Sequence, residues 1–252
     1  MASDGGDGLW CRGLPARYTL GPRAPRGAGP PQATSLVSLR DVDLSILRWL
    51  TCDHDPAWAE LPAYLVDDEW FGAAVFTLLW LLVALGRRSR ARAMPVLLAI
   101  VLAVGVGHGL REVIWRVAPR ARPANTFPAD KVLTGPFQRG TCASRPDAIV
   151  SRSYPPKSPS FPSSHTITAG CIAAALAYGS RWVGVLAWLY AGLVGLGRLW
   201  WTKHWPSDVV GSLVLSAAIG AVAWRIAVPL DARIRGTRIP GAAPPGAGGA
   251  PP

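Results

Sequence analysis

The stretch that decides the fold is Met94–Leu110, MPVLLAIVLAVGVGHGL, in which no residue carries a formal charge. A helix rises about 1.5 Å per residue, and roughly 20 apolar residues cross the hydrocarbon core of a bilayer. The apolar character continues past Arg111 and Glu112 to Trp115, so the segment reaches that length. It predicts a helix that spans a membrane.

Four more apolar runs have the same character, so we expect five spanning helices. The run that begins at Ile167 is short, and it reaches full length only if Ser163–Thr168 join its helix. Asp43–Leu50, DLSILRWL, is amphipathic and indicates an interfacial helix or a sixth, partial span. The expected fold class is therefore all-α, a polytopic membrane bundle of five to six transmembrane helices. The four further runs are Phe71–Gly86, Ile167–Gly179, Trp182–Gly197 and Val209–Leu230.

The composition of the 252 residues agrees with a membrane protein. Only 16% are charged, against roughly 25% in an average soluble domain, and there are 12 tryptophans. Residues 1–40 and 231–252 are rich in Gly, Pro and Ala and predict a disordered N-terminal tail and a cytoplasmic C-terminal tail. Between them we expect a membrane-embedded domain, 41–230, with an external loop at 124–161.

The chain is strongly basic, with 26 Lys and Arg against 15 Asp and Glu and a formal net charge of +11. No basic run has a soluble fold around it, which argues against nucleic acid as a partner. Anionic membrane lipids and a phosphate-bearing lipid substrate fit better. The sequence leaves the oligomeric state open.

Short loops set the expected orientation, because Arg and Lys concentrate on the cytoplasmic side. The loop after the first span holds four arginines and should be cytoplasmic. Alternation then places the end of the second span, the start of the third, the end of the fourth and the start of the fifth outside. The four arginines are Arg87, Arg88, Arg90 and Arg92.

Three polar clusters fall at these four expected outer boundaries. The first is Arg116–Pro123, RVAPRARP, and the second is Phe161–Thr166, FPSSHT. The third is Gly197–Asp208, in which Gly-Arg is followed after five residues by His and after three more by Asp. The predicted topology brings all three clusters to one face of the membrane.

Their side chains suit a phosphate ester. Arg122 and Arg198 can clamp phosphate oxygens with planar, bidentate guanidinium groups. Ser163 and Ser164 precede an apolar run, so they should lie at a helix N-terminus, where free N–H groups favour an anion. The sequence therefore predicts an anion site at this face.

Two histidines and a carboxylate complete the cluster. One imidazole can attack phosphorus while the other protonates the leaving oxygen. Asp208 lies four residues after His204, where a carboxylate can accept the second N–H of that ring and fix its tautomer. No carboxylates with metal-ligand spacing accompany them, so we expect no metal ion or other cofactor in the reaction. Cysteines form no CxxC pair, which argues against a structural zinc site; a Cys52–Cys142 disulfide and free thiols are both open.

The three clusters resemble the signature of the type 2 phosphatidic acid phosphatase superfamily. That signature is an Arg-Pro motif preceded by Lys, a Pro-Ser-Gly-His motif and a Ser-Arg-x5-His-x3-Asp motif, and the resemblance covers roughly residues 41–230. It implies that His204 is the nucleophile, that Asp208 orients it and that His165 is the general acid. It further implies that phosphate is bound by Arg122, Arg198, Ser163 and the Ser164 backbone.

Three positions depart from the family pattern. Trp115 stands where the family has the Lys of the first motif, and Arg116 or Arg111 is expected to replace that charge. Ser164 stands for the Gly of the second motif and keeps a small residue. Gly197 stands for the Ser of the third motif and removes one hydroxyl.

The predicted function is metal-independent hydrolysis of a lipid phosphate or diphosphate in the cell membrane, with the active site on the extracytoplasmic side. A polyprenyl diphosphate of the undecaprenyl type is the first choice, and phosphatidate or phosphatidylglycerol phosphate are alternatives. Two alternatives come from other classes: a catalytically weak phospholipid-binding membrane protein and a vanadate-dependent peroxidase. His108, in the middle of the second span, is interpreted as a neutral imidazole bonded to a neighbouring helix rather than as a catalytic group.

Overall fold

The computed structural model describes residues 38–53, 60–67, 69–86, 90–128, 131–133, 148–151 and 158–236. Its described part is mostly helical, as the apolar runs predicted. The helices are α1 (Leu39–Arg48), α2 (Glu60–Asp67), α3 (Glu69–Leu85), α4 (Ala93–Val117), α5 (Ser164–Gly179), α6 (Arg181–Trp200) and α7 (Pro206–Ile234), and the two short strands are β1 (Val132–Leu133) and β2 (Ile149–Val150).

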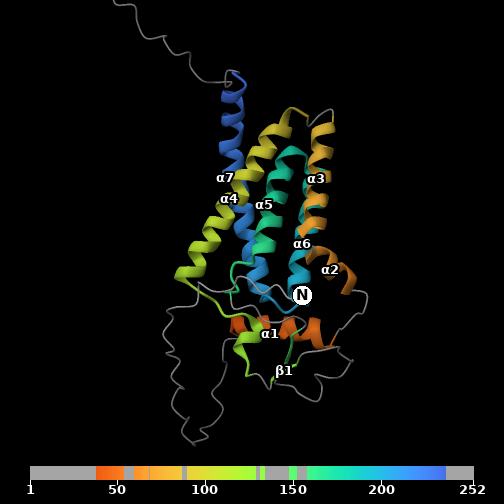
Figure 1. The fold of residues 1–252 in the computed structure, drawn as a ribbon, viewed down its shortest axis with the longest axis vertical. Coiled ribbons are helices and arrows are strands. Elements are labelled where there is room, and N and C mark those ends of the chain that lie inside the picture. The colour runs from red at the N-terminus through yellow and green to blue at the C-terminus, as the bar shows by residue number, and fades with distance from the viewer. Residues whose placement is uncertain are drawn as a thin grey trace, which may run out of the picture. The chain divides into compact units, whose positions relative to one another are not determined.

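Helices α3 to α7 run along one common direction, and α1 lies crosswise at one end of them (Figure 1). Ser38 caps α1, because its hydroxyl accepts from Asp41 N and the Asp41 carboxylate accepts from Ser38 N. The helix therefore begins at Leu39, inside the segment expected to be tail, and the chain continues beyond Arg48 in a π-helical turn, Trp49–Asp53.

Three of the described helices, α4, α6 and α7, are long and apolar enough to cross a membrane. Helix α3 has 17 residues, at the lower limit of a span, and α5 has 16, just below it, so the number of five spans stays a prediction. Large apolar side chains are exposed along α3, α4, α6 and α7, as expected of surfaces that face lipid. Examples are Leu78, Val101, Val106, Leu189, Leu193, Val214 and Val222.

Small residues hold the helices close together. Gly170 of α5 faces Ser216 of α7 so closely that a Cβ at Gly170 would lie 2.6 Å from the Ser216 Cβ. Ser216 Oγ donates across the contact to the Ile167 carbonyl oxygen at 3.1 Å. Close approach of backbones through small side chains is the ordinary way membrane helices associate, because lipid offers no hydrophobic drive for it.

The predicted external loop contains some regular structure where it is described. A 3-10 turn spans Pro123–Thr126, and β1 pairs with β2 in parallel, with Val132 opposite Ile149. The two predicted tails lie outside the described residues, except that α1 and α7 extend into their inner ends. Cys142 and the side chain of Cys52 also lie outside them, and buried Cys171 is a free thiol.

The chain direction brings the three polar clusters to the same end of the bundle. The first cluster begins in the last turn of α4 and continues beyond it, the second begins α5, and the third joins the end of α6 to the start of α7. This agrees with the shared face predicted from hydropathy and the placement of arginines.

Candidate active site

Arg122 is the residue through which the first and third clusters meet. Its Nη1 donates to the Lys203 carbonyl oxygen at 2.7 Å and lies 3.2 Å from His204 Nε2. Its Nε and Nη2 donate to the carbonyl and hydroxyl oxygens of Ser158, both at 2.9 Å. The side chain is buried, so the guanidinium is held rigidly beside the imidazole.

His204 is fixed in one tautomer. Nδ1 lies 2.7 Å from the Ser160 carbonyl oxygen, which can only accept, so Nδ1 carries the proton. Arg122 can only donate, so the lone pair of Nε2 faces its Nη1. The ring is 1% exposed. A neutral imidazole with its lone pair on Nε2 is the form that attacks phosphorus.

The structure differs from the expected hydrogen bond between His204 and Asp208. Nδ1 lies 3.9 Å from Asp208 Oδ2, beyond hydrogen-bond distance, because the Ser160 carbonyl takes its proton. Asp208 instead accepts from the Ser160 hydroxyl and from Trp205 N at 3.0 Å, and its Oδ1 accepts from Arg120 at 2.6 Å. The carboxylate is therefore connected to the imidazole through Ser160.

A tight turn after α6 carries His204 back to the bundle. Thr202 adopts a φ of 57°, in the left-handed region that ends many helices, and Lys203 N donates to the Arg198 carbonyl oxygen at 3.0 Å. Gly197, which replaces the family serine, makes room for α2: a Cβ there would lie 2.5 Å from Val66 Cγ2. The missing hydroxyl thus has a packing reason.

Positive charge gathers around His204. Burial lowers the pKa of His204 well below its usual 6.5, and the charges of Arg122 and Arg198 lower it further. Burial and the same two arginines lower the pKa of the Lys203 ammonium to about 8. Three cations this close together favour an anion, while burial and the two arginines, by lowering the His204 pKa, favour the neutral imidazole.

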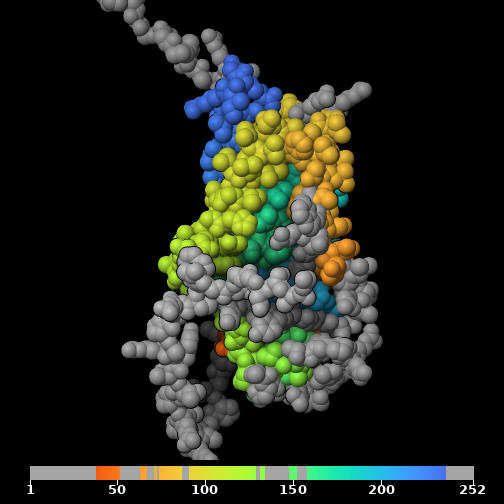
Figure 2. Space-filling view, in the orientation of Figure 1, coloured from red at the N-terminus to blue at the C-terminus, as the bar shows by residue number. Residues whose placement is uncertain are grey.

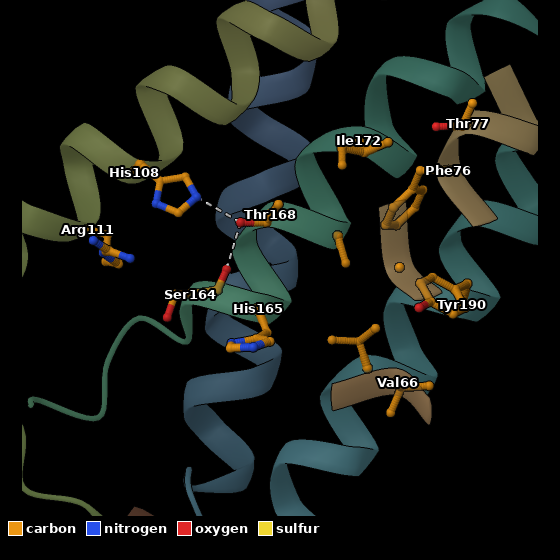
Figure 3. A pocket seen from close by; sticks show the side chains of 13 residues that line it. Val66, Phe76, Thr77, His108, Arg111, Ser164, His165, Thr168, Ile172 and Tyr190 are labelled. Atoms are coloured by element: carbon orange, nitrogen blue, oxygen red, sulfur yellow. Dashed lines mark hydrogen bonds between the residues drawn. The ribbon is translucent and has the colours of Figure 1, made fainter. Parts of the chain in front are cut away.

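His165 lines a cavity of about 580 Å³, and the lining does not include His204. The cavity is lined by Ser164 and His165 at the start of α5, with His108 to one side of them and Phe76 and Tyr190 to the other (Figure 3). Part of its wall is formed by α5, which is visible between α3 and α4 in the space-filling view (Figure 2). The charge of His165 also contributes to the lowered pKa of His204, so the two rings are electrostatic neighbours.

His108 makes the contact expected of it. Its Nε2 lies 2.9 Å from Thr168 Oγ1, and that hydroxyl donates to the Ser164 carbonyl oxygen at 2.9 Å (Figure 3). The single hydroxyl proton is therefore used, so His108 Nε2 is the donor. The interpretation of a neutral imidazole bonded to a neighbouring helix agrees with this geometry.

The two candidates for the missing lysine lie in different places. Arg111 lines the cavity beside His165 and stacks on Trp115, with its guanidinium carbon 4.6 Å from the ring centre. Arg116 has a side chain 79% exposed and pairs with Glu112 at 3.1 Å. The structure therefore brings Arg111, and not Arg116, to the predicted site.

The remaining predicted residues lie at this end of the bundle. Arg198 is buried in the last turn of α6, and Ser163 is the buried N-cap of α5, with its N–H donating to Ser212 Oγ at 3.0 Å. Ser164 and His165 form the first turn of α5, where N–H groups lack helical acceptors. Within the described part of the chain, His, Cys, Asp and Glu form no group of three that could hold a metal ion.

Ser160, Arg120 and Lys203 belong to the site but were not predicted. Ser160 and Lys203 stand next to the second and third motifs, yet serine and lysine in loops are too common to be a signal. Arg120 lies inside the first cluster, two residues before Arg122, and alternation of side chains in an extended segment could have suggested a shared direction.

Comparison with known proteins agrees with the motifs. The PAP2 superfamily model matches residues 110–230, which hold the decisive residues of all three clusters. Undecaprenyl-diphosphatase BcrC of Bacillus subtilis is 39% identical over 66 residues, which are 26% of this chain and only 34% of that relative.

Two crystal structures resemble the fold. The first transmembrane PAP2-type phosphatidylglycerolphosphate phosphatase from Bacillus subtilis aligns with a TM-score of 0.50 and 19% identity, over 79% of this chain and 89% of that one. LpxE of Aquifex aeolicus aligns with a TM-score of 0.49 and 21% identity, over 73% and 95%. Residues 110–230 of this multi-pass membrane protein match the PAP2 superfamily, which agrees with the resemblance that its three motifs predicted.

Proposed function

We propose that this protein hydrolyses a lipid phosphate or diphosphate through a phosphohistidine on His204, without a metal ion. The observation that carries the proposal is the tautomer of His204. The Ser160 carbonyl holds the proton on Nδ1, and the Nε2 lone pair points into the arginine cluster. A buried, neutral and oriented imidazole beside cations is the arrangement that attack on a phosphate anion requires.

The first step forms an N–P bond and breaks the P–O bond to the lipid. His165, in its protonated form, gives its proton to the departing oxygen. In the second step water attacks phosphorus, the N–P bond breaks, and His165 takes the proton from the water. Arg122 and Arg198 stabilise the phosphate oxygens in both steps, with the Ser163 hydroxyl and the Ser164 backbone as further donors.

Arg111 supplies the charge that the Trp115 substitution removes. It lines the same cavity as His165, and stacking on Trp115 holds its guanidinium in place. Its Nε is buried without a hydrogen-bond partner among the described residues. A phosphate oxygen in the cavity would satisfy that donor, so we assign to Arg111 the role that Arg116 was expected to share.

The cavity supports a lipid as the substrate. Apolar side chains from α2, α3, α5 and α6 line most of it, while Arg111, His108 and His165 line its polar side. An amphiphile with a phosphate head fits this division. A polyprenyl diphosphate is our first choice, in line with the name of the undecaprenyl-diphosphatase relative; phosphatidate and phosphatidylglycerol phosphate are the alternatives.

A phosphate-release assay on the detergent-purified protein tests the reaction. It should compare polyprenyl diphosphate, polyprenyl monophosphate, phosphatidate and phosphatidylglycerol phosphate. We expect turnover of at least one of them in excess chelator, and labelled phosphate trapped on the wild type but not on His204→Ala. Strong inhibition by chelator, or no trapped phosphate during turnover, would contradict the mechanism.

We further propose that the site faces the extracytoplasmic side, on the basis of the arginine-rich loop between α3 and α4. Ala121→Cys marks the site end of the bundle, and Arg233→Cys marks the opposite end; both positions are exposed. In a cysteine-free background, a membrane-impermeant maleimide should label Ala121→Cys in intact cells and Arg233→Cys only after permeabilisation. The reverse pattern would overturn the orientation.

A further inference from the structure

Asp43, on α1, is connected to the active site although it lies far from the three motifs in sequence. It is 1% exposed, on the face of α1 that also buries Leu47. Arg120 Nη2 donates to its Oδ2 at 2.7 Å, while Arg120 Nη1 donates to Asp208 Oδ1 at 2.6 Å. One guanidinium therefore bridges α1 to the start of α7.

Asp43 also binds the first turn of α7 directly. Ser207 N donates to its Oδ1 at 2.8 Å, and Ser207 Oγ donates to its Oδ2 at 2.5 Å. N–H groups in the first turn of a helix have no helical acceptor, and a carboxylate there is favoured by the helix dipole. Asp43 thus caps α7 from another helix, at the turn that carries Asp208.

From Asp208 the connection continues to the nucleophile through Ser160. The Ser160 hydroxyl donates to Asp208 Oδ2, and Ser160 N donates to the Arg120 carbonyl oxygen at 2.7 Å. The Ser160 carbonyl, held by these two bonds, accepts from His204 Nδ1. Each hydrogen bond in the series Asp43, Arg120, Asp208, Ser160, His204 involves groups that are buried or half-buried.

We infer that Asp43 is a positioning residue for the nucleophilic histidine, acting through Arg120, Asp208 and Ser160. The inference rests on the proposed function, in which His204 attacks phosphorus. Arg120 is shared between the carboxylates of Asp43 and Asp208. Because loss of the Asp43 charge weakens one of these two contacts, the guanidinium shifts, and the Asp208 carboxylate bonded to it shifts as well. The Ser160 carbonyl then no longer holds His204 in one tautomer. Asp43 lies outside residues 110–230, so a helix beyond the family region takes part in the site.

The kinetic test compares two carboxylates of the same helix. Asp43→Asn keeps the shape of the side chain but removes its charge. We expect kcat to fall roughly 10- to 100-fold, the loss typical of residues that hold the acting groups of a site in place. KM should change by less than about twofold. Asp41→Asn is the matched control, because Asp41 is exposed and only caps α1. Asp41→Asn should keep kcat within about twofold of the wild-type value. Thermal unfolding in detergent should show that both variants are folded.

A double-variant cycle tests the route. If Asp43 acts through Arg120, adding Asp43→Asn to Arg120→Gln should lower kcat no further. Equal fold losses in both backgrounds would overturn the inference, and so would a wild-type kcat in Asp43→Asn.

A spectroscopic readout separates failure of this inference from failure of the proposed function. The 15N shifts of the His204 ring, assigned with His204→Gln, report the tautomer whether or not any tested lipid is hydrolysed. We expect the Nδ1–H form in the wild type and in Asp41→Asn, and a mixture of tautomers in Asp43→Asn. An unchanged His204 signal in Asp43→Asn overturns the positioning role even if the enzyme is active. A wild type that releases no phosphate overturns the reaction instead.

Discussion

The surroundings of His204 and of His165, the two histidines of the site, are opposite in character. Around His204 the hydrogen bonds are already made: Arg122 and Ser160 occupy both ring nitrogens, and the ring is buried. Around His165 a cavity of about 580 Å³ is open, lined on one side by apolar groups. In the proposed mechanism the surroundings of His204 are therefore preorganised, which lowers reorganisation during the reaction, while the space beside His165 is open for the substrate.

The largest expected effect separates the two histidines by leaving group. His204→Ala should lower kcat by at least about 10⁴-fold on any phosphate ester, because the nucleophile is gone. His165→Ala should cost about 10²- to 10⁴-fold on a lipid phosphate. It should cost far less on p-nitrophenyl phosphate, since nitrophenolate leaves without a proton. Equal losses for His165→Ala on both substrates would contradict its role as general acid.

A smaller effect is expected from the cavity-side arginine. Arg111→Leu should lower kcat/KM about 10- to 100-fold, because a charged hydrogen bond to phosphate contributes about 1.5–3 kcal/mol. Arg116→Leu is the matched control on the same helix and should stay within about twofold, since its side chain is exposed. Steady-state kinetics on both variants checks this, and a larger loss in Arg116→Leu would return that residue to the site.

The next effect is a pH dependence set by the nucleophile side. His204 stays neutral well below pH 6.5, so the acidic limb of activity should not arise from its ordinary titration. As pH rises through about 8, Lys203 loses its proton and the site loses positive charge. We expect kcat/KM, which reports the free enzyme, to fall there by about tenfold.

Substitution at Lys203 sharpens the pH experiment. Lys203→Met should show the lowered kcat/KM at all pH values. Lys203→Arg should move the decrease in kcat/KM to higher pH, because a guanidinium group does not lose its proton near pH 8. A limb that persists near pH 8 in Lys203→Arg would assign it to another group.

The smallest effect tests whether His108 is structural. Thr168→Val removes its acceptor, and hydrogen bonds between membrane helices average about 0.6 kcal/mol. We expect a change of that size in unfolding free energy and less than about a threefold change in turnover. Unfolding in detergent and kinetics on the same sample measure both. A turnover loss above tenfold with unchanged stability would make His108 part of the reaction.

The sequence by itself predicted a bundle of apolar helices and the end of that bundle at which the three polar clusters lie. Both follow from local properties: apolar runs of sufficient length span a bilayer, and alternation of spans places the three clusters together. The short spacing between Arg198 and His204 within one motif also placed both residues near the junction of α6 and α7. Their assignment to a phosphate site needed only residue types that bind anions.

Only the tertiary structure decided which partners these groups choose. Asp208 is four residues from His204, yet its carboxylate bonds Ser160 and Arg120, because segments distant in sequence supply closer donors. Arg111 and Arg116 are five residues apart, about 140° around a helix, so one faces the cavity and the other does not. Asp43 belongs to none of the three motifs. Its contact with the start of α7 depends on how α1 packs, which no local sequence pattern encodes.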